Sequence, residues 1–264
     1  MNLRLLRTVI VSTVLVCGLS GCQQGNILGK EAEKAVATEP RSDSRLAEIN
    51  TQLGVEYMKE GNYEVALKKL KKAIDIDAGY ARAYDVLGLL YVQLGENDNA
   101  TQSFKRALEL APNDSNILNN YGLFLCRQGD PKQAQELFAK AVQNPLYQTP
   151  EVAYTNAALC ALDQQKDRES ARTFLRQALE KNPEMPVALL QMSRLTFDDK
   201  QYMAARGYFE RYAQVGKHTS ASLWLGVQIE QQLGNTDAAD SYAMTLKGKF
   251  PDSQEAQRLM KNEQ

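Results

Sequence analysis

The sequence predicts an all-α fold, an α-solenoid in which helix pairs stack one after another. Three observations predict it: similar short segments recur along the chain, each ends in alanine, and apolar residues of matching size follow at matching positions. The segments are EGNYEVA, LGENDNA, QGDPKQA, QKDRESA, DKQYMAA and LGNTDAA, which end at Ala66, Ala100, Ala134, Ala171, Ala205 and Ala239. The intervals between these alanines are 34, 34, 37, 34 and 34 residues, so we expect six units of one kind.

A 34-residue period is typical of the tetratricopeptide (TPR) repeat, a helix–turn–helix unit. Such units stack into a right-handed superhelix with a concave groove, and each unit contacts only its neighbours. The sequence therefore predicts one repeat domain over 46–253. We place its six repeats at about 47–80, 81–114, 115–148, 152–185, 186–219 and 220–253.

The first three repeats follow the pattern closely, the second most of all. Gly88 and Ala100 are small, which we attribute to a close approach of the two helices of one repeat. Leu87, Tyr91 and Phe104 are large, and we expect them to fill the space between neighbouring repeats. Repeats one and three offer the same residue types at the same spacing.

The last three repeats depart from the pattern. Ala157 and Ala158 stand where Leu-Gly is expected one residue later, Tyr212 takes a usual alanine position, and the Leu-Gly pair of the last repeat is displaced by one residue. We attribute the three-residue excess between repeats three and four to the segment NPLYQTPE, whose two prolines predict a non-helical link. The final segment, 254–264, is expected to be a polar cap.

The N-terminus carries the features of a signal peptide. Arg4 and Arg7 precede an apolar run of eleven residues from Val9 to Leu19. A helix needs roughly 20 apolar residues to span a bilayer, so this run is too short to be a stable membrane anchor. The sequence predicts a cleaved signal over 1–21.

The end of that run, LSGC, is similar to the bacterial lipobox. The resemblance implies cleavage before Cys22 and lipidation of its thiol; an ordinary cleaved signal that merely contains a cysteine is the alternative. Gln23 follows instead of the aspartate that commonly retains such proteins in the inner membrane, which favours the outer membrane. Residues 22–45 are polar and predict a flexible tether of about 25 Å. We expect a lipid-anchored protein that faces the periplasm.

Composition argues against several classes of function. The 31 basic and 32 acidic residues nearly cancel, which argues against a nucleic-acid partner. One histidine and four cysteines, without CxxC or HExxH spacing, argue against a metal site. No nucleophile triad, phosphate-binding loop or paired-carboxylate motif is present, so the sequence predicts no enzyme, no cofactor and no small-molecule substrate.

The first helices of the repeats predict a partner-binding groove. Positions 5, 9 and 12 of the first three repeats are largely apolar, and the Lys and Asn pairs by which some TPR domains bind a C-terminal carboxylate are absent. An extended or helical peptide is therefore the expected ligand, although neighbouring helices could equally cover part of these side chains. The candidate groove residues are Thr51, Val55, Met58, Asp85, Leu89, Val92, Asn119 and Leu123.

Two further features have more than one interpretation. Lys68, Lys69 and the pair Lys71–Lys72 favour a solvated convex face, with a role in binding lipid headgroups or a partner as the alternative. Cys126 and Cys160 fall in the first helices of consecutive repeats, which stacking would bring close together. An oxidising compartment favours a disulfide, and two buried thiols are the alternative.

Two stretches point to a family. The segments NNYGLFLCRQG and NPLYQTPEVAYTNAALCAL resemble the PilF/PilW family of type IV pilus biogenesis lipoproteins. The resemblance implies a monomeric pilotin, a lipoprotein that binds the secretin subunit of the pilus machine and promotes its outer-membrane localisation and multimerisation. The alternative is a TPR scaffold lipoprotein for another envelope machine, in peptidoglycan hydrolase regulation or outer-membrane protein assembly.

Overall fold

The computed structural model describes residues 42–262, which lie in one compact unit. The predicted signal peptide, Cys22 and nearly all of the tether lie outside the described residues. The helices are α1 (Ser42–Lys59), α2 (Tyr63–Ile76), α3 (Ala81–Leu94), α4 (Asn97–Leu110), α5 (Ser115–Arg127), α6 (Pro131–Gln143), α7 (Pro150–Cys160), η1 (Ala161–Gln165), α8 (Arg168–Lys181), α9 (Pro186–Asp198), α10 (Tyr202–Val215), α11 (Ser220–Gln232), α12 (Thr236–Lys249) and α13 (Gln254–Asn262).

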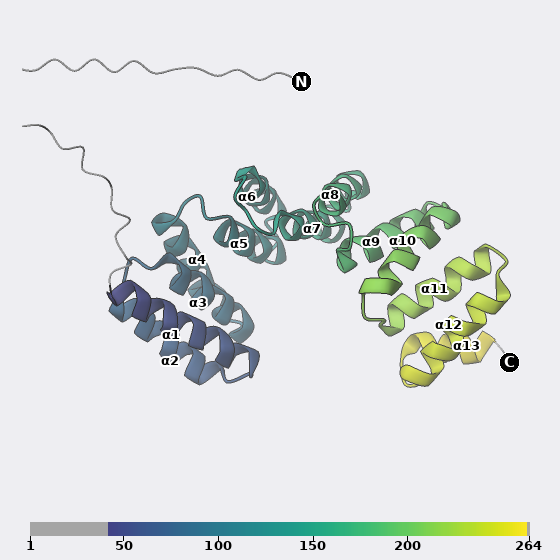
Figure 1. Ribbon diagram of the computed structural model, residues 1–264, viewed down its shortest axis with the longest axis horizontal. Helices are drawn as coiled ribbons and strands as arrows, with labels where there is room; N and C mark the ends of the chain where they lie inside the picture. Colours follow the sequence, from purple (N-terminus) through teal and green to yellow (C-terminus); the bar gives the residue numbers. More distant parts are fainter. Residues whose placement is uncertain (1–41, 263–264) are drawn as a thin grey trace, which may run out of the picture. The chain divides into compact units, whose positions relative to one another are not determined.

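Consecutive helices from α1 to α12 form six antiparallel pairs (Figure 1). Each pair also packs against the next: α3, α5, α7 and α11 each contact both helices of the pair before them, and α9 contacts α8. The described residues contain no strand. The predicted α-solenoid of TPR units is confirmed.

The recurring turn segments end one helix and begin the next. Asn62, Asp130, Asp167 and Asn235 are N-cap residues whose side chains accept a hydrogen bond from a backbone N–H three residues later, which satisfies a donor that has no partner within the helix. In all six repeats, the residue before the N-cap of the second helix has a left-handed backbone conformation. Four repeats use glycine there, whereas repeats four and five use Lys166 (φ 57°) and Lys200 (φ 62°).

The alanines that end these segments are buried in every repeat. Five of the six have no exposed surface, and Ala239 has 4%. The predicted close approach is also present: a Cβ atom added to Gly88 would lie 2.9 Å from the ring of Phe104. Gly122 faces Phe138 in the same way. These positions are small because the facing helix leaves no room.

The three-residue excess is shared between two places, which corrects the assignment to NPLYQTPE alone. The connection 144–149 has six residues, whereas 111–114 and the other described connections between pairs have four. In addition, the first helix of repeat four is prolonged by a π-helical turn, Ala161–Gln165. A π-turn accommodates an extra residue without ending the helix.

The two ends of the described stack differ. At the C-terminal end α13 packs on α11 and α12 and buries Ala256 and Leu259. At the other end no described element precedes α1, and Leu46, Ile49 and Leu53 are exposed there. None of the described helices has a stretch of 18 residues apolar enough to cross a membrane.

Candidate partner-binding groove

The first helices of the first three repeats surround two adjoining hollows. Val55, Val86 and Leu89 line both and form a continuous aliphatic wall from α1 to α3. One hollow, of about 290 Å³, is lined in addition by Arg82, Asp85, Asp114, Asn116, Ile117 and Asn120. The other, of about 270 Å³, is lined in addition by Met58, Lys59, Tyr63 and Gln93. We call the two hollows together the N-terminal groove.

Four of the eight predicted groove residues line it. Val55, Met58, Asp85 and Leu89 come together as the register of the repeats predicts. Val92 and Leu123 line neither hollow. They are half-buried against the core cluster that contains Phe104 and Phe124, so they support the groove from the side.

Thr51 and Asn119 are buried and line neither hollow, which corrects their assignment to the groove lining. Thr51 is 1% exposed, and its hydroxyl donates to the carbonyl oxygen of Ala47 at 2.9 Å. Asn119 is 6% exposed, and its Oδ1 accepts from Nδ2 of Asn156 at 2.9 Å. Asp85 occupies the same position of repeat two and is 5% exposed, but it lines one of the hollows.

Several lining residues were not predicted. Arg82, Val86, Asn116 and Asn120 precede or follow predicted groove positions by one helical turn or less. Arg82 and Val86 lie three residues from Asp85 and Leu89, and Asn116 and Asn120 lie three residues from Asn119 and Leu123. This spacing was their signal, because it places a broader stripe on one helix face than three positions per repeat.

Asp85 is the buried polar residue of the groove. It is 5% exposed, and both oxygens of its carboxyl group accept from Nδ2 of Asn120, at 3.2 and 3.0 Å. The pKa of Asp85 is raised to about 7, chiefly by burial and to a lesser extent by the nearby Asp114, although the hydrogen bond from Asn120 and the charge of Arg82 lower it. Near neutral pH a large part of the population therefore carries no charge here, and the groove is less acidic than its composition indicates.

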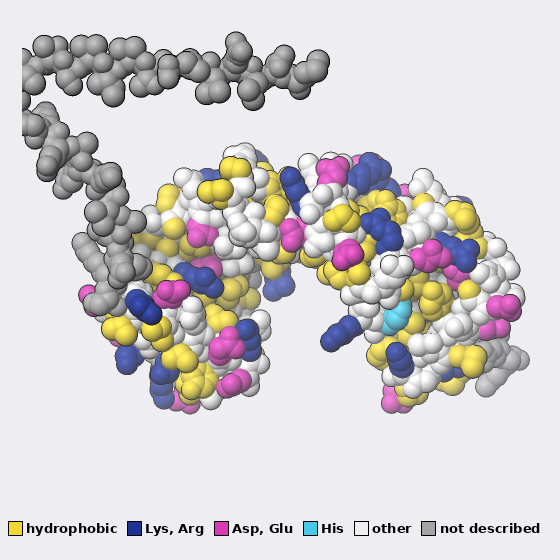
Figure 2. Space-filling view, viewed as in Figure 1, with side chains coloured by type: hydrophobic (Ala, Val, Ile, Leu, Met, Phe, Trp, Pro, Cys, Tyr) yellow, Lys and Arg dark blue, Asp and Glu magenta, His cyan; other side chains and the backbone are white. Residues whose placement is uncertain are grey.

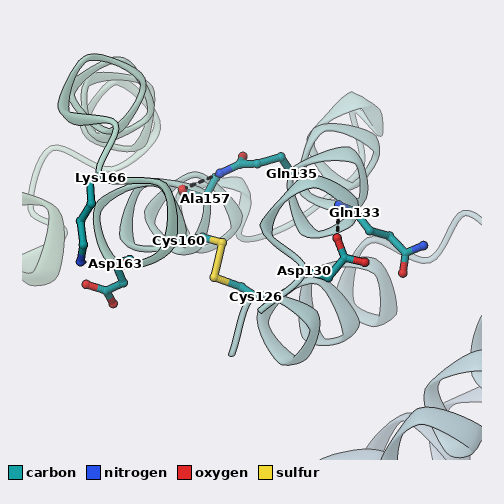
Figure 3. The surroundings of a disulfide bond; sticks show 8 residues. All are labelled: Cys126, Asp130, Gln133, Gln135, Ala157, Cys160, Asp163 and Lys166. Carbon is teal, nitrogen blue, oxygen red and sulfur yellow. Dashed lines mark hydrogen bonds between the residues drawn. A yellow bond between two sulfur atoms is a disulfide. The ribbon is translucent and has the colours of Figure 1, made fainter. Parts of the chain in front are cut away.

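The next junction along the stack is crosslinked. A disulfide joins Cys126 of α5 to Cys160 of α7, with their Cα atoms 5.9 Å apart (Figure 3). Nearby, Nε2 of Gln135 donates to the carbonyl oxygen of Ala157 at 2.9 Å. Together with the bond between Asn119 and Asn156, these contacts fix α7 on repeat three. The groove thus ends at a rigid junction.

The groove has the chemistry of a peptide-binding surface. Its wall is aliphatic, and its polar groups are two carboxyls, a guanidinium, an ammonium, a phenol hydroxyl and amides, several of which could pair with a peptide backbone. Among residues 42–262, no group of three or more His, Cys, Asp or Glu side chains is placed to hold a metal ion. The groove lining offers a peptide apolar side chains for burial, hydrogen-bonding groups and charged groups.

Comparisons with known proteins agree with the repeat register. Models described as TPR repeat or tetratricopeptide repeat match residues 54–95, 81–114, 103–136 and 122–186. The type IV pilus assembly protein PilF of Pseudomonas aeruginosa is 30% identical over 246 residues, which cover 93% of this chain and 95% of PilF.

Two solved structures are similar over nearly their whole length. The crystal structure of PilW, described as a widely conserved type IV pilus biogenesis factor, has 33% identity and a TM-score of 0.72, and the match covers 82% of this chain and 99% of PilW. The structure of Pseudomonas aeruginosa PilF has 30% identity and a TM-score of 0.77, and that match covers 83% and 99% of the two chains. The similarity therefore includes the repeats that depart from the general pattern.

Proposed function

Because this chain belongs to the family of type IV pilus biogenesis TPR proteins that includes PilF and PilW, we propose that it is the pilotin of its pilus machine. In this proposal, it is held on the outer membrane by acyl chains on Cys22 and faces the periplasm. It binds the secretin subunit and promotes its outer-membrane localisation and multimerisation. Proteins of this family are biogenesis factors and not enzymes, so binding is the activity to explain.

The observation that carries the proposal is the aliphatic wall shared by the two hollows of the N-terminal groove. Val55, Val86 and Leu89 come from two successive first helices, so a bound segment would bridge two repeats. An aliphatic side chain of an extended or helical secretin segment would gain about 1.5–3 kcal/mol on full burial there. The polar groups around Asp85 would satisfy backbone groups of the same segment. Family membership favours pilus biogenesis over a scaffold role in another envelope machine.

Deletion of the gene tests the function as a whole. We expect loss of heat-resistant secretin multimers from outer-membrane fractions and loss of twitching motility. Normal multimers together with intact motility would reject the pilotin proposal.

A single substitution tests the groove. Leu89→Asp places a charge on the aliphatic wall, and the cost of removing that charge from water should lower co-purification of the secretin at least about tenfold. Met244→Asp is the matched control, because Met244 is 72% exposed on α12, far along the chain from the groove. If Leu89→Asp protein folds normally and retains the secretin as well as the control does, the interface lies elsewhere on the chain.

A further inference from the structure

The exposed end of the solenoid carries aliphatic side chains at positions that are buried in later repeats. Ile49 is 43% exposed, whereas the residues 34 and 68 positions later, Ala83 and Ile117, are 0% and 2% exposed. Leu53 is 38% exposed, whereas its counterpart Leu87 is 7% exposed. The difference has a simple cause. Ala83 and Leu87 lie in buried clusters with residues of repeat one, and no described repeat precedes repeat one to do the same.

Leu46 extends this aliphatic stripe by one helical turn and is 49% exposed. The stripe Leu46, Ile49 and Leu53 follows the i, i+3, i+7 spacing that keeps side chains on one face of α1. A solenoid ordinarily ends in a polar surface, as α13 provides at the other end. The stripe is thus a core-type surface without a cover among the described residues.

The repeat register places three of the four lysines in the α2 run on the same side of the pair as this stripe. In repeat two, Leu87 lines one hollow of about 370 Å³ together with Gln102, Ser103 and Arg106 of the second helix. The residues 34 positions earlier are Leu53, Lys68, Lys69 and Lys72, so the register places three lysines beside the stripe. Figure 2 shows hydrophobic and basic side chains side by side over α1 and α2.

The charges of this face are only partly neutralised. Lys68 pairs with Glu64 at 2.7 Å, and both side chains are exposed, so the pair contributes little. Lys69 and Lys72 have no ion pair among the described residues. The face therefore combines aliphatic side chains with ammonium groups that can bind phosphate.

We propose that this face, Leu46, Ile49, Leu53, Lys69 and Lys72, docks on the surface of the membrane that anchors the chain. The occupant is the interfacial layer of an anionic bilayer: the aliphatic side chains enter the acyl boundary, and the lysines bind lipid phosphate groups. This proposal rests on the proposed lipid attachment at Cys22.

The position of the face along the chain favours the membrane over other occupants. The stripe begins 24 residues after Cys22, and a flexible segment of that length has a root-mean-square reach of about 25–30 Å. The end of the stack that carries the stripe is therefore the end that the anchor keeps near the bilayer. A tethered contact needs little intrinsic affinity, because the tether holds the face at a high effective concentration.

The test uses the unacylated chain from Gln23 onward, which contains the whole compact unit described above. Binding is measured by flotation with vesicles of phosphatidylethanolamine and phosphatidylglycerol, and with phosphatidylcholine vesicles for comparison. We expect binding to the anionic vesicles and much weaker binding to phosphatidylcholine. Lack of binding to the anionic vesicles would overturn the proposal.

Two variants locate the contact. Lys69→Gln/Lys72→Gln should weaken binding about 30-fold, from the loss of two charges near an anionic surface, and Ile49→Ser/Leu53→Ser should weaken it about tenfold or more. The matched control is Lys71→Gln/Lys105→Gln, which removes equal charge. Lys105 does not line the repeat-two hollow, and Lys71 is its counterpart in repeat one. An equal loss in the control would overturn the assignment of this face.

The same variants distinguish the membrane from two other occupants of this face. A dimer that dissociates in Ile49→Ser/Leu53→Ser would assign the face to a second copy of the chain. Loss of secretin co-purification in that variant, with vesicle binding unchanged, would assign it to the secretin. The Leu89→Asp variant, by contrast, should bind vesicles normally whether or not it still binds the secretin. The groove proposal and the membrane proposal can therefore fail independently.

Discussion

At the scale of single residues, burial of the Asp85 carboxyl group lowers the free energy of unfolding when that group is ionised. Its pKa in the folded chain is about 7, above the ordinary value of 3.8, because the folded state buries it. The folded state therefore binds this proton more tightly than the unfolded state does. From this group alone, the free energy of unfolding falls as pH rises from about 4 to about 7, and it is constant above that range.

Asp85→Asn should remove this dependence. Asparagine has nearly the same shape, can still accept from Asn120 and cannot ionise. We expect the free energy of unfolding to rise by about 1–2 kcal/mol at pH 8, less than the full pKa difference implies because the site relaxes, and to change little at pH 4.

Chemical denaturation at the two pH values measures this effect. Asp75→Asn, at an exposed position of α2, is the control and should change little at either pH. An equal gain for Asp85→Asn at both pH values would show that packing, and not ionisation, limits stability at this position.

Residue patterns predicted part of the groove for a physical reason. Val55, Met58 and Leu89 were predictable because their helix face follows from the repeat register. The absence of Thr51 and Asn119 from the lining was not predictable, because Asp85 occupies the same position of repeat two and does line the groove. A period in sequence places a residue on a face but does not say how much of that face the next helix covers.

At the scale of elements, the helix pairs followed from sequence because four of the six turns within pairs carry a local cap signal. An N-cap Asn or Asp and an alanine four residues later mark the second helices at Asn62, Asp130, Asp167 and Asn235. The π-turn Ala161–Gln165 carries no such signal, so an excess of three residues could not be divided between a loop and a helix. The left-handed conformations of Lys166 and Lys200 could not be predicted either, because neither position has the glycine that usually marks such a turn.

The disulfide between α5 and α7 links repeat three covalently to repeat four. Its two cysteines are 34 residues apart, and closing a loop of that length lowers the entropy of the unfolded chain. Cys126→Ala/Cys160→Ala should therefore lower the free energy of unfolding by about 3–4 kcal/mol. The transition should also broaden, because the repeats on either side become less tightly coupled.

Urea titration followed by circular dichroism measures both effects, and the parent chain after reduction is the control. Reduced parent and double variant should unfold at similar urea concentrations, well below the oxidised parent. If the reduced and oxidised parent chains unfold together, the disulfide contributes nothing to stability, and apolar packing with the hydrogen bonds of Asn119 and Gln135 holds the junction without it.

At the scale of the whole molecule, local contacts explain why the fold was predictable. Each pair contacts chiefly its neighbours, so a correct register in one repeat constrains the next. The stack repeats one unit, yet its function depends on differences between units. The groove lies in repeats one to three, the crosslink follows it, and the exposed aliphatic stripe is confined to the end nearest the anchor in sequence.

The proposed anchor gives the last prediction. Acyl chains on Cys22 would hold the protein on the membrane, since each buried methylene contributes about 0.8 kcal/mol and the described helices offer no membrane-spanning segment. Cys22→Ala should therefore release the protein into the periplasmic fraction, and the secretin should lose its outer-membrane localisation with it. The stripe on α1 is too weak to replace several acyl chains, so a residual membrane-bound fraction should disappear at high salt. Fractionation with immunoblotting of both proteins measures this, with Cys17→Ala as the control for a cysteine change in the same segment. An unchanged secretin location in Cys22→Ala cells would mean that delivery does not depend on the anchor.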